Sequence, residues 1–336
     1  MAPWQQARAA QTSPTLESPT LVDMYLYLED ISDLNLTLGT FDITAQLLLR
    51  WQDERVSFDP ADNNGIDRKV WVGKQAAKRL ETMWQPLLEV SGVKGLSSRD
   101  VHSLIVYADG SVELHEKLHA TPQFVGELES YPFGRLNLNF VLTSVAMDTA
   151  QINYSLKYLD PTDMETLDAI VHGNWEPVSI AWHLNAVPRP DVPNELFPQA
   201  EVKIVVEHDF IDGLHKIFLP LFIIGMAACG LQWINHLAQP AYSSGRVGGL
   251  TTLILTTIAL KFVLTRELPV LHYGTLTDAL FNVTIVMLII GLLFSCAISA
   301  LLTEGHQHKA VMVNQIVRKV YPFVYLIAVI LMFIIF

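Results

Sequence analysis

The sequence predicts a chain of two domains: an N-terminal antiparallel β-sandwich followed by a bundle of four membrane-spanning helices. Residues 1–212 hold 15 basic and 31 acidic side chains, a net charge of −16, whereas residues 213–336 hold 7 and 3, a net charge of +4. The first part consists of short alternating runs and the second of four long apolar segments. The expected boundaries are a flexible arm over 1–20, the sandwich over 21–212 and the helices over 213–336.

The composition narrows the classes of function. An acidic domain repels phosphates, so nucleic acid is not an expected partner. The two cysteines, Cys229 and Cys296, both lie in apolar segments and imply no disulfide scaffold. The sequence contains no phosphate-binding loop, no metal-spaced set of cysteines and histidines and no G-x-S-x-G motif. We therefore expect no enzyme, no catalytic residues, no cofactor and no metal site. The first 20 residues also lack the apolar core of a signal peptide.

Short runs of alternating or apolar residues, separated by turn residues, predict the strands of the sandwich. These runs are 24–28, 41–51, 101–107, 112–118, 136–145, 152–158, 178–184 and 202–206. Asp109-Gly110 between two of the runs predicts a hairpin. Many short strands with few long periodic segments are typical of an antiparallel sandwich.

Two local patterns stand out in this part. Residues 51–60, WQDERVSFDP, alternate large and charged side chains and predict a strand with one aromatic and one ion-paired face, ending at Pro60. Residues Tyr131-Pro132-Phe133-Gly134 predict a proline turn flanked by aromatic rings.

The four helices are expected at about 214–237, 244–268, 277–303 and 317–336, with a link of about a dozen residues before the last. Pro220 lies near the start of the first helix, where proline costs little. Lys309, Arg318 and Lys319 precede or open the fourth helix, and Arg246 opens the second. Basic residues mark the cytoplasmic side, so the acidic domain is expected outside the inner (cell) membrane.

The second helix differs from the others because it carries Arg246, Lys261 and four threonines. Polar groups at membrane depth usually face protein or water. Helical spacing places seven residues on one face, namely Ser244, Gly248, Thr252, Leu255, Ala259, Phe262 and Arg266. We expect this face to line a pore, with a gate at Leu255, Ala259 and Phe262, because apolar rings stop ions by dewetting. The alternative is a buried helix whose threonines bond to its own carbonyls.

Three motifs occur in an order that resembles the pentameric ligand-gated ion channels (the Cys-loop receptor superfamily), in their cysteine-free bacterial branch. The motifs are residues 51–60, Trp84-Gln-Pro86 and the turn at 131–134, which departs from the family at Gly134, where the family has aspartate. The two loop cysteines of the animal receptors correspond to Phe124 and Leu138. The resemblance implies a homopentamer in the lipid bilayer that conducts ions in response to a small-molecule agonist.

The resemblance also locates the coupling between the two domains. In the family an aspartate of the turn pairs with an arginine before the first helix, and these positions are Gly134 and His208 here. Other members of the expected junction are Tyr131, Pro132, Phe133, His215, Pro269 and His272. Histidine changes its charge near neutral pH, so we predict that opening depends on pH between about 6 and 9, with His208 foremost and the sign undetermined.

The agonist is not identified by the sequence. The aromatic positions of amine-binding relatives correspond to Gln46, Ser91 and Val145, and the nearest aromatic residues are Trp182 and Phe197. A quaternary ammonium needs an aromatic box, so agonists resembling acetylcholine are not expected.

Ion selectivity is less sharply predicted. The acidic domain enriches cations, which favours cation conduction. Ser244-Gly245-Arg246 lacks the glutamate ring of cation-selective relatives, however, and Arg266 faces the outer mouth. The alternative function is a non-conducting periplasmic sensor anchored by a helical bundle.

Overall fold

The computed structural model describes residues 13–15, 18–94, 97–126, 128–161, 163–189, 192–234, 241–269 and 271–336. The chain forms two compact units: residues 1–35, 39–126 and 136–207, and residues 36–38, 127–135 and 208–336. Two segments expected within the sandwich domain, 36–38 and 127–135, therefore group with the helices. Most of the expected N-terminal arm lies outside the described residues.

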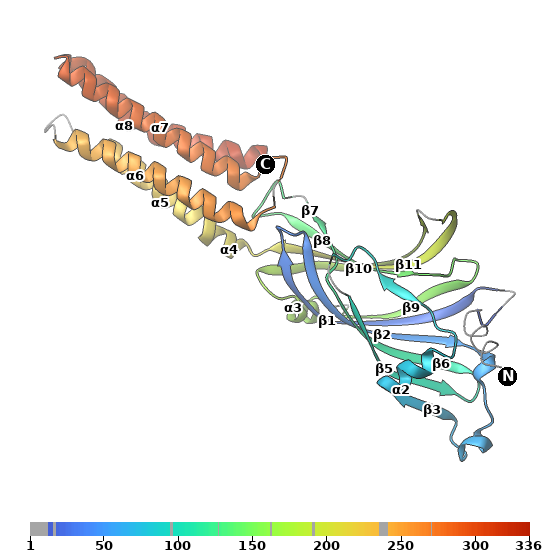
Figure 1. The fold of residues 1–336 in the computed structure, drawn as a ribbon. Coiled ribbons are helices and arrows are strands. Elements are labelled where there is room, and N and C mark those ends of the chain that lie inside the picture. The colour runs from blue at the N-terminus through green and yellow to red at the C-terminus, as the bar shows by residue number, and fades with distance from the viewer. Residues whose placement is uncertain are drawn as a thin grey trace. The chain divides into compact units, whose positions relative to one another are not determined.

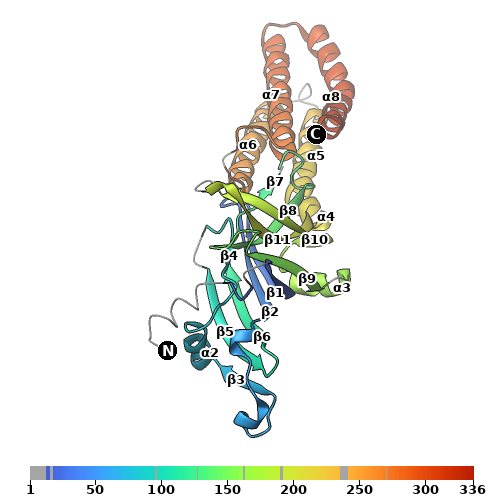
Figure 2. The same cartoon turned by 90° about the vertical axis from the view of Figure 1, so that its right-hand side faces the viewer.

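The first unit contains two sheets, which can be traced in Figure 1 and Figure 2. In spatial order, the six-stranded sheet consists of β3 (Arg68–Val72), β5 (Ser98–Tyr107), β6 (Ser111–Ala120), β2 (Thr40–Gln52), β1 (Thr20–Asn35) and β9 (Ile152–Asp160). The five-stranded sheet consists of β10 (Trp175–Arg189), β11 (Val192–His208), β8 (Arg135–Ser144) and β4 (Leu88–Val90), with β7 (Val125–Gly126) paired to β8.

Alternation along the strands builds the core of the sandwich. Leu47 and Leu49 on β2 are fully buried, as are Leu138 and Phe140 on β8 and Ile204 on β11. Successive side chains of a strand point to opposite faces, so every second residue enters the space between the sheets. Burying each such side chain contributes about 1.5–3 kcal/mol.

Strand pairing matches the prediction except at one edge. The hairpin at Asp109-Gly110 is confirmed, because it joins the antiparallel strands β5 and β6. Gly110 has a φ of 87°, and a Cβ there would lie 2.8 Å from the carbonyl oxygen of Asp53. Only glycine fits this turn. β9 pairs parallel to β1, with Thr20 opposite Ile152, because the chain reaches β9 directly from β8 of the other sheet.

The prediction of one strand through residues 51–60 is wrong. β2 ends at Gln52, and two short 3-10 helices follow, Glu54–Val56 and Pro60–Asn63. Arg55 turns back onto Asp53, with Nε–Oδ1 2.7 Å and Nη2–Oδ2 2.8 Å. The Asp53 side chain is only 1% exposed, and a buried carboxylate requires such a bidentate partner. The ion pair therefore closes a turn instead of lining a strand.

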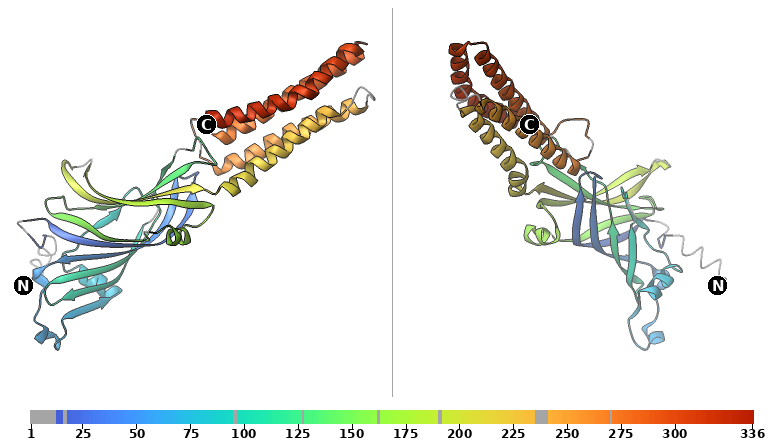
Figure 3. Two further views of the ribbon diagram at one scale, coloured as in Figure 1. Left: turned by 180° about the vertical axis from the view of Figure 1, so that it is seen from behind. Right: turned by 60° about the vertical axis from the view of Figure 1, so that its left-hand side comes forward.

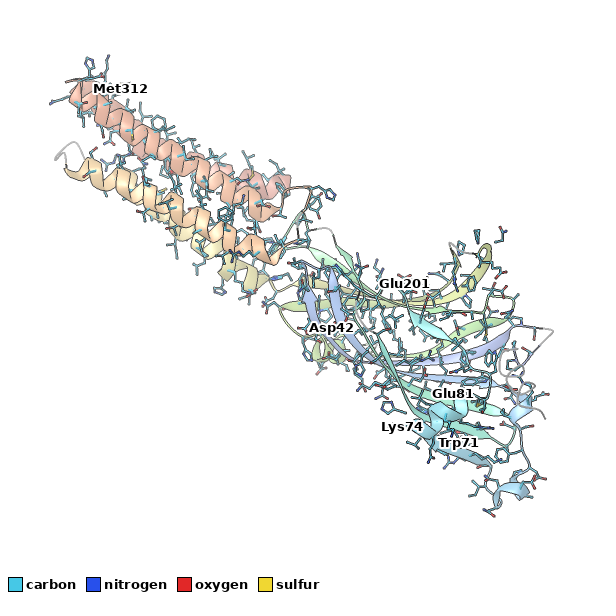
Figure 4. The ribbon with its side chains drawn as sticks, in the orientation of Figure 1. Asp42, Trp71, Lys74, Glu81, Glu201 and Met312 are labelled. Atoms are coloured by element: carbon cyan, nitrogen blue, oxygen red, sulfur yellow. The ribbon has the colours of Figure 1, made fainter. Side chains whose placement is uncertain are left out.

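Two short helices accompany the sheets, α2 (Lys74–Leu80) and α3 (Met164–Ile170). Figure 4 labels Trp71 of β3 beside α2, where the Arg79 guanidinium lies 5.5 Å from the Trp71 ring centroid. Asp163 caps α3 by accepting a hydrogen bond from the Thr166 amide at 2.8 Å, which lowers the pKa of the Asp163 carboxyl.

Among its described residues, the second unit contains four helical segments long and apolar enough to cross a membrane, 210–233, 243–264, 276–303 and 307–335. They run alongside one another in Figure 3. Their elements are α4 (Phe210–Gly213), a π-helical segment (Leu214–Phe218), α5 (Leu219–Trp233), α6 (Ala241–Leu264), a 3-10 turn (Thr265–Glu267), α7 (Leu276–Thr303) and α8 (Gln307–Ile335).

The last link is shorter than predicted. α7 ends at Thr303 and α8 begins at Gln307, so three residues join them instead of about a dozen. The helix extends below the apolar stretch because Ala310 and Asn314 continue the buried face of Val317 and Tyr321 at helical spacing. The predicted end of the first helix, 237, lies outside the described residues.

Candidate functional site

Six of the seven residues predicted to line a pore share the exposed side of α6, and the seventh, Arg266, lies in the 3-10 turn that follows it. Each of them is exposed within the single chain, including Leu255 at 63% and Phe262 at 66%. The opposite side packs into the helical bundle, where Leu250 and Thr257 are fully buried. α6 therefore presents a face that its own subunit does not use.

The threonines of α6 satisfy their hydroxyl groups locally. Thr251, Thr252 and Thr256 each donate to the carbonyl oxygen four residues before, at 2.9, 3.0 and 2.9 Å, and all three are exposed. Thr257 makes the same bond on the buried side. Such bonds mask the hydroxyl donors without removing the oxygen lone pairs, so the exposed side stays moderately polar.

Arg246 and Lys261, the two basic residues that single out this helix, both bond to neighbouring helices. Arg246 is 1% exposed and its Nη1 donates to Oδ1 of Asn314 on α8 at 3.1 Å. Lys261 Nζ donates to Oδ1 of Asn282 on α7 at 2.8 Å and lies 3.2 Å from Oδ1 of Asp278. Both cations point toward neighbouring helices, and Arg266 is the charged member of the exposed face.

The turn at 131–134 is built from stacked rings. Phe133 stacks on Phe210 and on Phe218, each with 5.3 Å between ring centroids, and Phe218 stacks on Phe333 at 5.4 Å. Pro132, which follows a cis peptide bond, packs on Gly213, where an added Cβ would lie 3.0 Å from its Cγ. Aromatic pairs in these arrangements contribute beyond their buried area.

Hydrogen bonds join the same turn to the start of α7. Leu276 N–H donates to the Glu129 carbonyl at 2.7 Å, and the Thr277 hydroxyl donates to the Tyr131 carbonyl at 2.9 Å. Leu128 N–H donates to the Tyr273 hydroxyl at 3.2 Å. The turn is therefore held by the 273–277 segment as well as by α4 and the π-helical segment.

His208 lies inside this junction. Its ring packs edge-on against Tyr131, with 5.7 Å between centroids, and its side chain is 8% exposed. Its Nε2 lies 3.7 Å from Oδ2 of Asp212, which also accepts from Lys216 at 2.9 Å. The acidic neighbour of His208, the last residue of β11, thus comes from α4 four residues later, and the sequence analysis missed Asp212 although this spacing was visible.

The other predicted members of the junction have different surroundings. His215 is exposed, contacts the Ile211 carbonyl at 2.9 Å and lines a cavity of about 610 Å³ between α5, α7 and α8. His272 is exposed beside Tyr273. Gly134 and Pro269 are half-buried. Of the three histidines, His208 is the buried one.

The five predicted ligand-pocket residues divide between the two sheets. Gln46 lies on the outward side of β2 and donates to Glu29, whose bond from Lys117 at 2.6 Å lowers the pKa of the Glu29 carboxyl. On the other sheet, the Ser91 hydroxyl bonds to that of Thr143 at 2.7 Å. Trp182 is an exposed residue of β10.

The two remaining predicted pocket residues, Val145 and Phe197, both contact an arginine that the sequence analysis did not identify. Arg189, at the end of β10, donates to the Val145 carbonyl, and its guanidinium lies 4.9 Å from the ring centroid of Phe197. Phe197 is 3% exposed. The face of this ring is thus covered by a cation of the protein itself.

A β-sandwich followed by four membrane-crossing helices, one with an unused polar-to-apolar face, defines a multi-pass membrane receptor whose sandwich lies outside the membrane. Residues 8–208 match the family model for the neurotransmitter-gated ion-channel ligand-binding domain, and the chain belongs to this family. The chain is also similar to a proton-gated ion channel of Gloeobacter violaceus, with 23% identity over 335 residues, covering 97% of this chain and 86% of the relative.

The family assignment bears on several sequence predictions. The resemblance to bacterial pentameric ligand-gated channels and the two-part fold are confirmed. The family comprises ligand-gated ion channels and not enzymes, and a pentameric assembly fits it. The β7–β8 register, with Val125 opposite Asn137, places Phe124 opposite Leu138 when it is continued by one residue, as expected for the two positions that replace the loop cysteines.

Proposed function

We propose that the chain is one subunit of a homopentameric, pH-sensitive cation channel of the inner membrane whose pore is lined by α6. The exposed face of α6 carries this proposal. This face runs from small and polar at Ser244 to apolar at Leu255 and Phe262, and Arg266 follows in the 3-10 turn after the helix. The subunit covers none of the seven predicted residues. Five copies in a ring would close this face into a pore with an apolar constriction.

The decisive experiment is to record current across a lipid bilayer containing the purified protein while pH is varied. Single-channel steps are expected, and native mass spectrometry should give five times the 37.6 kDa of one chain. A silent bilayer at every pH and with every ligand tried, despite an intact pentamer, would instead identify a sensor that does not conduct.

The pH sensitivity rests on His208 and on the relative, which is described as proton-gated. The buried imidazole of His208 lies between Tyr131 and Asp212, and it forms an ion pair with Asp212 only when it is protonated. Tyr131, which packs against His208, belongs to the turn at 131–134, and this segment bonds to residues 276 and 277. A displacement of the His208 ring therefore moves the start of α7. The two protonation states then favour different positions of the turn.

Cation conduction is favoured by the charge distribution. Residues 1–212 carry a net charge of −16, and five such domains would surround the outer entrance. The turning of Arg246 into the bundle removes the one arginine that would have stood at the cytoplasmic mouth. The residues left there, Ser244 and Gly248, are uncharged.

A further inference from the structure

α6 is attached to its own bundle by one cation near each end, and the two attachments are unequal. Arg246, near the start of the helix, is 1% exposed and bonds to Asn314. Lys261 lies 15 residues later, about 22 Å along the axis, and its side chain is 27% exposed. The first contact is sealed in protein, whereas the second is partly open to solvent.

Lys261 binds at the place where α7 begins. Asp278 uses its Oδ1 for Lys261, while its Oδ2 accepts from the Thr275 hydroxyl at 3.1 Å in the cap of α7. Asn282, one turn further along α7, accepts the 2.8 Å bond from the same ammonium. The lysine is thus bound to the first two turns of α7.

The same turns of α7 also bond to residues 128–134, which contain the turn at 131–134 and are called the coupling turn. Leu276 and Thr277, which bond to the carbonyls of Glu129 and Tyr131, lie within two residues of Asp278. A continuous series of polar contacts therefore runs from the 128–134 segment through the α7 cap to Lys261. These contacts reach α6 at Lys261, next to Phe262, and bypass the 265–275 link between α6 and α7.

From this geometry we infer that Lys261 and Asp278 position the outer half of α6, so that displacement of the coupling turn moves the Phe262 level of the pore through their ion pair. The Arg246–Asn314 contact holds the other end of the helix in place. This inference rests on the proposed channel function and identifies the contact through which the gate is controlled.

The test is a charge exchange read by current. Lys261→Glu places two carboxylates together, and we expect it to shift the half-activating pH or ligand concentration, or the current without stimulus, by about two- to fivefold, because partly exposed pairs have that strength. Asp278→Lys in the same chain restores an ion pair with reversed polarity and should return the response to that of the wild type. Lys261→Gln should shift the response in the same direction as Lys261→Glu and by less.

One control separates positioning from helix stability. Asp278 also belongs to the cap of α7, so a change there could act by weakening the helix. Thr275→Ala removes the cap hydroxyl and leaves the Lys261–Asp278 pair intact. If Thr275→Ala reproduces the shift expected of Lys261→Glu, or if the charge exchange fails to restore the response, the inference is wrong.

A second readout keeps the inference independent of conduction. Val263 is 60% exposed beside Phe262 and outside the predicted pore face, so a spin label on Val263→Cys reports the spread of the helix ends in the assembled protein. Cys229 and Cys296 are first replaced by serine. Pulsed EPR distances should change in Lys261→Glu and revert in the exchanged pair. If the distances revert in the exchanged pair but the wild type carries no current, the positioning role is supported and the channel proposal is overturned. If the wild type carries current but the distances do not change in Lys261→Glu, the channel proposal is supported and the positioning role is overturned.

Discussion

Leu255 lies on the exposed side of α6, one turn above Thr252 and one turn below Ala259. We expect Leu255→Thr to raise the current without stimulus by at least about tenfold. A ring of hydroxyls is wetted more easily than a ring of leucines, and 1.4 kcal/mol in the opening equilibrium is sufficient for that change. Bilayer recordings at fixed protein density measure it.

Leu253, which is half-buried on the bundle side, supplies the matched control for this change. Leu253→Thr should lower stability without increasing spontaneous opening. If Leu255→Thr channels open no more readily than the wild type, the constriction is not at Leu255, and the same substitution at Phe262 becomes the next test.

His208→Arg should flatten the response to pH between about 6 and 9, because arginine stays charged beside Asp212 at every pH in this range. The measurement is open probability against pH. His272→Arg, at the exposed histidine, should leave the curve unchanged. A wild-type response that is flat over the same range, or an unaltered curve in His208→Arg, would remove His208 from the mechanism.

Choline esters are expected neither to open nor to block the channel. Gln46, Ser91 and Val145 offer no aromatic wall, and the Arg189 guanidinium already covers the Phe197 ring. Dose–response recordings check this prediction. A response at micromolar concentration that Trp182→Ala abolishes would contradict it.

Single residues were predictable where a spacing rule applied to them and were missed where a partner far along the chain decided their role. Helical spacing identified six exposed positions of α6 and the exposed Arg266 in the turn after it. Arg189 was missed because its partners, Val145 and Phe197, come together through the β10–β11 and β8–β11 pairing, which the sequence does not specify.

Among the elements, α6 depends on α8 through a contact in the bundle interior. Asn314→Ala removes the amide oxygen that accepts from the buried Arg246 guanidinium, and should cost about 1–3 kcal/mol per subunit. Thermal unfolding of the purified protein in detergent measures this loss. Gln315→Ala, at the exposed neighbour on the same turn, should leave the unfolding temperature unchanged, and an equal loss in both variants would show that only helix propensity had been altered.

Element boundaries were less predictable than element types. Residues 51–60 alternate as a strand does, yet the affinity of Arg55 for the buried Asp53 bends the chain after Gln52. The first turns of α8 are too polar to be predicted as part of a membrane helix, but Ala310 and Asn314 are buried on the side of α8 that packs in the bundle. A local ion pair in the first case and packing within the helical bundle in the second outweighed the sequence pattern.

At the scale of the whole molecule, the contrast between an acidic first part and an apolar second part was sufficient to predict the sandwich and the four helices. The pairing of β1 with β9 was not predictable, because alternation fixes which face of a strand is buried but not which strand lies beside it. The grouping of residues 36–38 and 127–135 with the helices has the same origin, since contacts between distant segments define it.

The charge of the whole molecule predicts its selectivity. In a salt gradient, the reversal potential should lie near the equilibrium potential of the cation, because the net charge of −16 on residues 1–212 concentrates cations above the pore. Raising the ionic strength should reduce the single-channel conductance relative to bulk conductivity, since salt screens this field. A reversal near the chloride potential would contradict cation selectivity and make Arg266 the first residue to substitute.

The three-residue link between α7 and α8 has a consequence for how the protein can be controlled. With the sandwich outside, this link and the residues between Trp233 and Ala241 are the chain's internal cytoplasmic loops. Neither loop is long enough to fold into a platform for a kinase, a scaffold or the cytoskeleton. Control through a folded domain is therefore not expected of these two loops.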